Sequence, residues 1–201
     1  MENMTPVRAD TFKNLVFDAG ILLKDFDYSS ATDAETLAAL VKTAKTSGEK
    51  LLGATKGGVN IQTNFDFWSP EFDGKRMAYK GEKRLSNAEC IISGTLVELL
   101  PDNVRDVVAL ADKSGTGAKI EVKPRFEIKE GDYLDSVVWI GNHGSGGLYL
   151  VELQNALCTS GMSTQTTDKD VGTLPFEFHG HASDVAATEL PIKYVFFKAK
   201  A

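Results

Sequence analysis

The stretch that decides the fold is VNIQTNFDF, residues 59–67, in which largely apolar and polar side chains alternate. In an extended segment, one face would carry Val59, Ile61, Thr63, Phe65 and Phe67. The opposite face would carry Asn60, Gln62, Asn64 and Asp66. Because successive side chains of a β-strand point to opposite faces, this period of two predicts a half-buried strand. Its outer face is polar and contains no cation.

The residues that follow predict a long antiparallel hairpin. Asp73-Gly74 marks a turn, and the basic stretch from Lys75 to Arg84 is expected to return as the antiparallel partner. A second strand is expected from Glu89 to Leu100, with Gly94 as a candidate bulge. Pro101, whose fixed φ suits the first turn of a helix, then begins a short helix. Its apolar face contains Val104, Val107, Val108 and Ala111.

Further along, five more segments are predicted as strands. In residues 119–129 the apolar side chains Ile120, Val122, Phe126 and Ile128 are expected inside, and the charged ones Lys119, Glu121, Lys123, Arg125, Glu127 and Lys129 outside. Val137–Ile140 and Leu148–Leu157 flank a glycine-rich turn and predict a second hairpin. Residues 174–181 alternate, and Ile192–Phe197 is apolar. Many strands and two helices, without a regular βαβ alternation, predict a mainly β (α+β) antiparallel fold.

The first 50 residues are expected to form an N-terminal arm, residues 1–24, and a loop plus helix, residues 25–50. The arm is predicted to contain two extended segments separated by a turn at Asp18-Ala19-Gly20. The helix is expected to begin at Thr32, with Glu35 completing a capping box, and to end at Ser47-Gly48. Its narrow, alanine-rich stripe could cover its own domain or a neighbouring copy, and we expect residues 25–49 to be mobile until a neighbouring copy orders them.

The chain of 201 residues has the size and composition of a single soluble globular domain. Its 22 basic and 28 acidic residues give a net charge of −6, opposite to the basic footprint of a protein that grips nucleic acid. No apolar run approaches the roughly 20 residues of a membrane span, and the first residues lack a signal-peptide pattern. A protein made and kept inside a cell is therefore expected, with Cys90 and Cys158 as free buried thiols.

Residue patterns that carry catalysis or hold ligands are weak throughout the chain. Gly48 and Gly53 have the separation of a phosphate loop, but the Lys-Ser/Thr pair that holds phosphate and magnesium does not follow. The turn at Ser145 lacks the strand, elbow and helix of a serine hydrolase. His179, His181 and Glu177 could face one way on a strand, but no fourth ligand is suggested, which favours an exposed polar face. We therefore expect no catalytic residue, no metal site and no cofactor.

Several stretches spread over most of the chain carry a further signal. They are NLVFDAGILL (14–23), LGATKGG (52–58), DYLDS (132–136) with Trp139, LQNAL (153–157) and LPFEFHGH (174–181). In this order and spacing they resemble the major tail tube proteins of long-tailed bacteriophages and prophages, especially those that infect Gram-positive bacteria. In one departure, Leu100 precedes Pro101 where that family often has a capping Ser or Thr, which predicts a less well capped helix.

The resemblance implies an antiparallel β-sandwich or partly rolled barrel with a flanking helix. It also implies a structural virion protein of the phage tail, made in the cytoplasm of the bacterial host, that assembles with itself into stacked hexameric rings. DNA would pass through the lumen of these rings on ejection. The expected partners are further copies of the chain, the tape measure, tail terminator and distal tail proteins, and DNA in transient non-specific passage; no membrane partner is expected.

Two sets of residues are the candidate sites of such a subunit. A conduit should not bind phosphates, so the cation-free face is expected to line the lumen; it consists of Asn60, Gln62, Asn64 and Asp66. Contacts between subunits are expected at Leu15, Phe17, Leu37, Leu40 and Val41.

Two alternatives stay open. The same fold could serve a contractile phage tail, a phage-tail-like bacteriocin or a type VI secretion tube, and a neighbouring gene for a sheath protein would mark that class. A monomeric β-sandwich that binds carbohydrate would instead need an exposed stacking platform of Trp68, Tyr79 or Trp139. Trp139 lies in an apolar run, which favours the core for that side chain.

Overall fold

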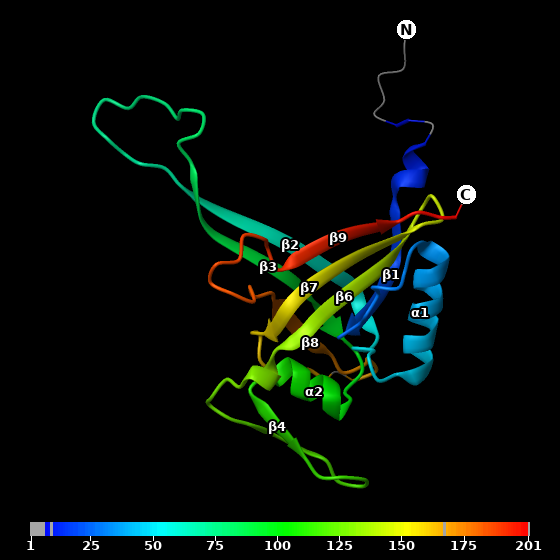
Figure 1. The fold of residues 1–201 in the computed structure, drawn as a ribbon. Coiled ribbons are helices and arrows are strands. Elements are labelled where there is room, and N and C mark those ends of the chain that lie inside the picture. Colours follow the sequence, from blue (N-terminus) through cyan, green and yellow to red (C-terminus); the bar gives the residue numbers. More distant parts are fainter. Residues whose placement is uncertain (1–6, 9, 167, 201) are drawn as a thin grey trace.

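The computed structural model describes residues 7–8, 10–166 and 168–200, arranged as Figure 1 shows. The strands are β1 (Val16–Lys24), β2 (Thr55–Trp68), β3 (Arg84–Leu96), β4 (Ala111–Ser114), β5 (Glu121–Pro124), β6 (Leu134–His143), β7 (Leu148–Cys158), β8 (Leu174–His179) and β9 (Ile192–Phe197). The α-helices are α1 (Ala34–Ser47) and α2 (Pro101–Val108), and two short 3-10 helices are η1 (Thr11–Asn14) and η2 (Glu130–Asp132). The described residues therefore form a mainly β fold, as predicted.

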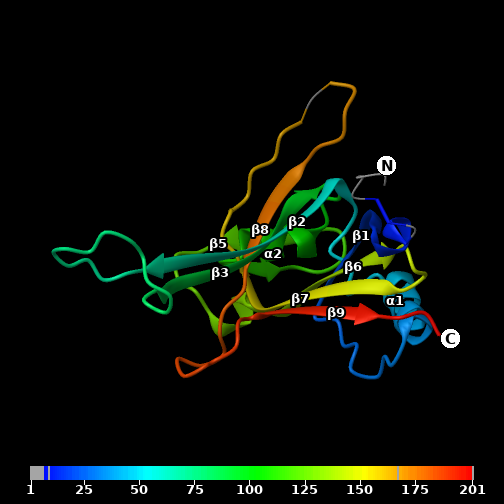
Figure 2. The ribbon, with the colours of Figure 1, turned by 90° about the horizontal axis from the view of Figure 1, so that it is seen from above.

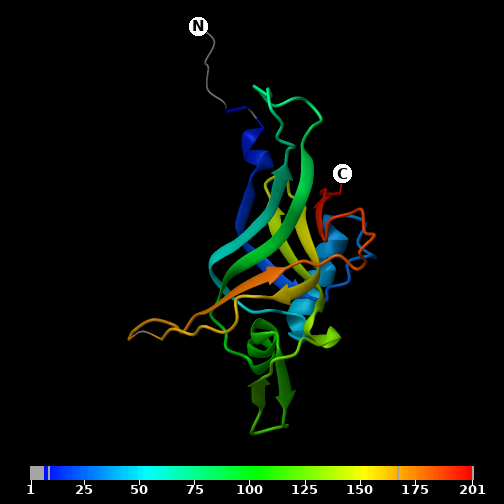
Figure 3. The ribbon, with the colours of Figure 1, turned by 90° about the vertical axis from the view of Figure 1, so that its left-hand side faces the viewer.

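Seven strands form one antiparallel sheet in the order β1-β6-β7-β8-β3-β2, with β9 paired to β7. Strand β7 joins the two parts of this sheet, because residues 148–153 pair with β9 and only Leu157 and Cys158 pair with β8. The two parts curve around a common core (Figure 3), to which Trp139 and Val151 contribute from one part and Ile92 and Phe176 from the other. The sheet is not a closed barrel, since no ladder among the described residues joins its edges β1 and β2.

Helix α1 packs on the other face of the part formed by β1, β6, β7 and β9 (Figures 1 and 2). Leu37 is fully buried, at 0% exposed, in a second core cluster with Leu23 and Leu150. Leu40 and Val41 are half-buried against the same cluster. Leu37 therefore has no surface left for a neighbouring subunit, and its assignment to a subunit contact is wrong. The stripe is narrow, but the sheet of its own chain supplies the apolar surface that it needs.

The two helices differ in how their first turns are capped. Asp33, not Thr32, caps α1: its carboxylate accepts the N–H of Thr36 at 2.8 Å, and the Thr36 hydroxyl accepts the N–H of Asp33 at 3.1 Å. The predicted box of Thr32 and Glu35 is thus displaced by one residue. Gly48 ends α1 with a φ of 73°, as predicted. Leu100 precedes α2 and gives no side-chain cap, which agrees with the predicted weak start.

Strand β1 contains an irregularity where a turn was expected. Its register with β6 shifts between Phe17 and Ile21, and Gly20 has a φ of +72°. A Cβ on Gly20 would lie 2.5 Å from Nε1 of Trp139, whose indole N–H donates to the carbonyl oxygen of Ala19 at 2.9 Å. The backbone at this bulge therefore packs directly on Trp139. Of the predicted arm, residues 1–6 and 9 lie outside the described residues.

The segment 119–129 differs most from its prediction. Only Glu121–Pro124 is a strand, and it pairs with β4 in a separate hairpin at the lower end of Figure 1. Phe126 is completely exposed (104%) and Ile128 is also exposed, although both were expected inside. Residues 126–130 are all exposed, so the predicted alternation between inside and outside is absent there. Arg125, expected outside, turns inward to the buried carboxylate of Asp132.

Candidate functional site

The hairpin of β2 and β3 carries the predicted lumen residues and projects beyond the rest of the sheet (Figures 1 and 2). Its connecting loop spans residues 69–83, so the returning strand begins only at Arg84, the last residue of the stretch that was expected to return. A register shift between Thr55 and Val59 places the bulge at residues 56–58 of β2, opposite Thr95, and not at Gly94, which pairs with Val59. The alternating strand is thus confirmed, but the predicted partner stretch from Lys75 to Arg84 is wrong, because most of it lies in the loop. β2 pairs instead with β3, which overlaps the separately predicted strand from Glu89 to Leu100.

One side of this hairpin is a mainly polar surface, which we call the polar face; Ile91, opposite Gln62, is its one aliphatic and buried member. Asn60, Gln62, Asn64 and Asp66 are all exposed on it, as their alternation predicts. The strand register adds Asn87, Glu89, Ile91, Ser93 and Thr95 from β3, and Pro175, Glu177 and His179 from β8. None of these side chains is Lys or Arg. The absence of cations, predicted for one strand, thus extends across three adjacent strands as far as the pair Asp66–Asn87. The next pair on this side, Trp68 and Arg84 at the outer end of the hairpin, contains a cation.

Two basic side chains in or beside the polar face contact a carboxylate. His179 Nε2 lies 2.8 Å from Glu177 Oε1. Lys56, in the bulge of β2, lies 2.8 Å from Asp170, and the hydrogen bond from Lys56 lowers the pKa of that carboxyl. The ammonium group of Lys56 is therefore partly neutralised at the border of the polar face.

The other side of the hairpin changes from core to open surface along its length. Ile61 packs against the main core, whereas Phe65, Phe67 and Leu85 farther along are exposed. The exposure arises because the hairpin extends past the strands that cover its first half (Figure 2). Exposed apolar side chains gathered in this way mark a surface suited to protein contacts.

The loop at the tip of the hairpin is held in shape by one ion pair. Lys75 Nζ lies 2.9 Å from Glu82 Oε1 and donates to the carbonyl oxygen of Pro70 at 3.0 Å. The hydrogen bond from Lys75 lowers the pKa of Glu82. Residues 69–84 contain five cations and three carboxylates, which gives them a net charge of +2. Because the whole chain has a net charge of −6, its other residues have a net charge of −8. The tip is thus a basic projection on an acidic protein.

The other residues predicted from the sequence to lie in subunit contacts, a stacking platform or buried thiol sites are partly on the surface and partly in the core. Leu15 and Phe17, expected at subunit contacts, are exposed near the start of β1. Trp68 and Tyr79 are exposed, but Trp139 is only 7% exposed, so the three do not form one stacking platform. Cys90 and Cys158 are both free and buried, as predicted, and burial raises the pKa of the Cys90 thiol.

The histidines near the end of β8 have separate partners. His181 Nδ1 lies 3.1 Å from the carbonyl oxygen of Asn155, and its ring packs edge-on against Tyr133, whereas His179 contacts Glu177. In the part of the chain that the structure describes, no three His, Cys, Asp or Glu side chains are grouped so that they could hold a metal ion. Ser145 lies 2.8 Å from His143 Nδ1 in an exposed turn between two strands, which is not the context of a nucleophile elbow.

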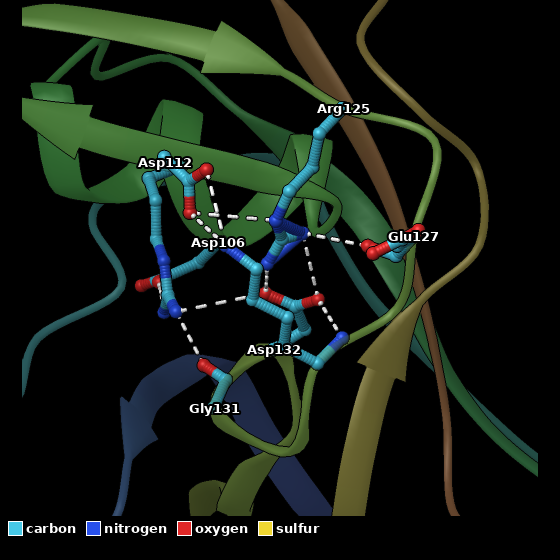
Figure 4. Close-up of polar contacts among 8 residues, drawn as sticks. Asp106, Asp112, Arg125, Glu127, Gly131 and Asp132 are labelled. Atoms are coloured by element: carbon cyan, nitrogen blue, oxygen red, sulfur yellow. Dashed lines mark hydrogen bonds and ion pairs between the residues drawn. The ribbon is translucent and has the colours of Figure 1, made fainter.

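The sequence pattern did not reveal a network of buried charges near α2 (Figure 4). Arg125 makes two hydrogen bonds to the carboxylate of Asp132, one of them 3.0 Å long, and Asp132 is buried. Arg125 also donates to the carbonyl oxygen of Glu127 at 2.9 Å, and the N–H of Lys129 donates to Asp132 at 2.7 Å. These contacts supply the Asp132 carboxylate with an opposite charge and with hydrogen-bond donors, which offsets the cost of burying it.

The network continues into the body of the protein. Arg105 of α2 donates to the carbonyl oxygen of Gly131 and lies 3.1 Å from the buried carboxylate of Asp106. Asp106 also pairs with Lys24 at the end of β1. The chain of ion pairs therefore ties the segment after β5 to α2 and to the sheet. Local periodicity contains no signal for it, because the paired residues come from separate elements.

No protein-family model matches the chain, and no curated protein matches it at a significant level. Among the described residues, no helix combines the length and the apolar character needed to span a membrane.

Proposed function

We propose that this chain is the major tail tube subunit of a long-tailed bacteriophage or prophage, which assembles into stacked hexameric rings whose lumen conducts DNA. The observation that carries the proposal is the polar face, a largely exposed surface of three neighbouring strands that contains no Lys or Arg as far as the pair Asp66–Asn87. In the assembled tube this surface would line the lumen, with Asn60, Gln62, Asn64 and Asp66 directed toward the DNA.

The chemistry of the polar face suits transit of DNA better than binding of DNA. Each protein cation that meets a phosphate releases counterions and adds affinity that is independent of sequence. Amide side chains are neutral and release no counterions, so they add no such affinity for the DNA backbone. The carboxylates of Asp66, Glu89 and Glu177 repel the phosphates. A wall built from these groups would let duplex DNA slide during ejection.

Three features of the isolated subunit support assembly: an open strand edge, an uncovered apolar strip and an uneven distribution of charge. The outer edge of β2 presents unpaired backbone groups over a long strand, which is the ordinary template for pairing with another chain. Phe65, Phe67 and Leu85 leave an uncovered apolar strip on the projecting hairpin. The basic tip and the acidic remainder attract each other between copies, so the contact would be electrostatically favourable. The tape measure, tail terminator and distal tail proteins would complete such a tail.

The test is a concentration series of the purified protein in analytical ultracentrifugation, combined with negative-stain microscopy at the highest concentration. The proposal expects rings or tubes with a central channel. A protein that stays monomeric at every concentration, and forms no tube when mixed with a tail initiator complex, would contradict it. Monomers that bind glycans through Trp68 and Tyr79 would instead support a carbohydrate-binding module.

A further inference from the structure

We infer that the segment Phe126 to Glu130 docks on a second copy of this chain, in the pocket beside the turn between β6 and β7. This inference rests on the proposed function, because it names one contact through which copies would associate. We call the segment the knob.

The knob presents apolar side chains to water and acidic side chains around them. Phe126 is completely exposed and Ile128 is exposed two residues later. Glu127 and Glu130 flank them, and neither carboxylate forms an ion pair within the part of the chain that the structure describes. An exposed aromatic side chain beside an aliphatic one is typical of the anchor of a protein interface.

The buried charges hold the knob in a fixed shape. Arg125, directly before Phe126, is tied to Asp132 by two hydrogen bonds, and the backbone N–H of Lys129 donates to the same carboxylate. The Lys129 ammonium also lies 3.0 Å from Asp112 of β4. Both ends of the knob are therefore anchored by groups behind it (Figure 4). A segment whose backbone is already held in place loses less conformational freedom when it binds.

The acceptor pocket lies at the opposite end of the molecule from the knob (Figures 1 and 3). It has a volume of about 460 Å³, and its apolar walls are formed by Leu148, Phe196 and Phe197. Phe196 is exposed in this wall, where it stacks on Tyr149 with ring centroids 4.5 Å apart. A pocket of this size has room for the side chains of a phenylalanine and an isoleucine.

Charge complementarity selects a second copy as the occupant. Lys198 lines the pocket, and Lys200 lines the hollow next to it. Within the described residues neither lysine forms an ion pair, although the pKa of the nearby Asp33 is lowered by hydrogen bonds from Thr36 and also by the charge of Lys200. Lys198 is therefore the more available partner for the carboxylates of Glu127 and Glu130. An apolar centre surrounded by opposite charges is the usual anatomy of a specific interface. Because knob and pocket are different surfaces at opposite ends, the contact is head-to-tail and repeats from copy to copy.

The test compares Phe126→Asp with a matched control, Val185→Asp, since Val185 is also completely exposed (107%) but belongs to neither surface. Self-association is measured by analytical ultracentrifugation, and folding by urea unfolding. Phe126→Asp should weaken association roughly tenfold or more, and Val185→Asp should leave it unchanged. Glu127→Lys with Glu130→Lys should weaken association too, and adding Lys198→Glu with Lys200→Glu should restore it.

A cysteine pair gives a second measurement that does not depend on weakened binding. Phe126→Cys combined with Ser145→Cys, at the rim of the pocket, should form disulfides between copies under oxidation, because the native Cys90 and Cys158 are buried. If wild-type protein associates, yet the knob variants associate equally well and no such cross-link forms, the docking inference is overturned while the proposed function stands. Wild-type protein that never associates overturns both.

Discussion

Replacing Gln62 and Asn64 by lysine should turn the polar face into a surface that holds DNA. The strand register gives the two positions different strengths. Gln62 lies opposite Ile91, so a new ammonium group there would have no carboxylate across the strand. Asn64 lies opposite Glu89, and a lysine there would be partly neutralised, because directly opposed side chains on neighbouring strands are in contact. Gln62→Lys alone should therefore produce most of the effect.

The size of the effect follows from counterion release. Each lysine that meets a phosphate contributes about −0.9 to the slope of log K against log salt concentration. For each subunit in contact with DNA, raising the salt from about 50 to about 200 mM should weaken binding about threefold for Gln62→Lys. The limit for the double variant is about twelvefold, reached only if both lysines engage phosphates. The wild-type polar face, which carries no cation, should show almost no retention at any salt concentration.

The assay is DNA protection by assembled tubes. Tubes are assembled with short duplexes, treated with nuclease at several salt concentrations, and sedimented, and the protected DNA is measured. The matched control is Thr43→Lys with Thr46→Lys, which adds the same charge on exposed positions of α1. DNA protected equally by the control, or no salt-dependent protection in the polar-face variant, would refute the reasoning about the lumen.

Three further predictions concern the stability of the subunit. Leu37→Ala should lower the free energy of unfolding by about 3 kcal/mol, and Leu40→Ala by about 1 kcal/mol, because only Leu37 is fully buried; urea unfolding with an unchanged m-value checks both. Leu100→Ser should raise it by about 0.5–1 kcal/mol by capping α2, seen as a higher urea midpoint. The hydrogen bond from Lys129 lowers the pKa of Asp112 below its ordinary value of 3.8, so the stabilisation is complete above about pH 4 and is lost as the pH falls through the lowered value. Asp112→Asn should therefore make the urea midpoint less dependent on pH in this acidic range.

The parts of the fold that the sequence predicts are those in which one face is buried and the other meets water. In β2 the alternation between Val59 and Phe67 corresponds directly to the two sides of the hairpin, because register errors there would move every apolar side chain out of the core. The exposure of Asn60, Gln62, Asn64 and Asp66 could be predicted for the same reason. What periodicity could not predict is how far the hairpin projects, since the covering strands come from distant parts of the chain.

The two clear errors have a common physical origin. Around Phe126 the period is present in the sequence, but Arg125 turns inward because it pairs with the buried Asp132, and Phe126 is left exposed. Around Leu37 the narrow stripe suggested weak burial, yet Leu23 and Leu150 come from two other strands to cover it. A periodic pattern shows that an element has two different faces. Which other part of the chain packs on each face depends on the topology of the fold.

The two tryptophans of the chain lie in opposite environments, which makes each of them a separate fluorescence reporter. Trp139 is enclosed in the main core with its indole N–H bonded to Ala19, so its emission should be blue-shifted and should change only when the subunit unfolds. Trp68 ends β2 beside the projecting loop and is 59% exposed, so its emission should be red-shifted and accessible to iodide. Covering of the hairpin by another copy would shift the Trp68 emission to the blue and leave that of Trp139 unchanged. In a Trp68→Phe protein the remaining signal would follow folding alone, and comparison with the wild-type emission would isolate the part that reports polymerisation.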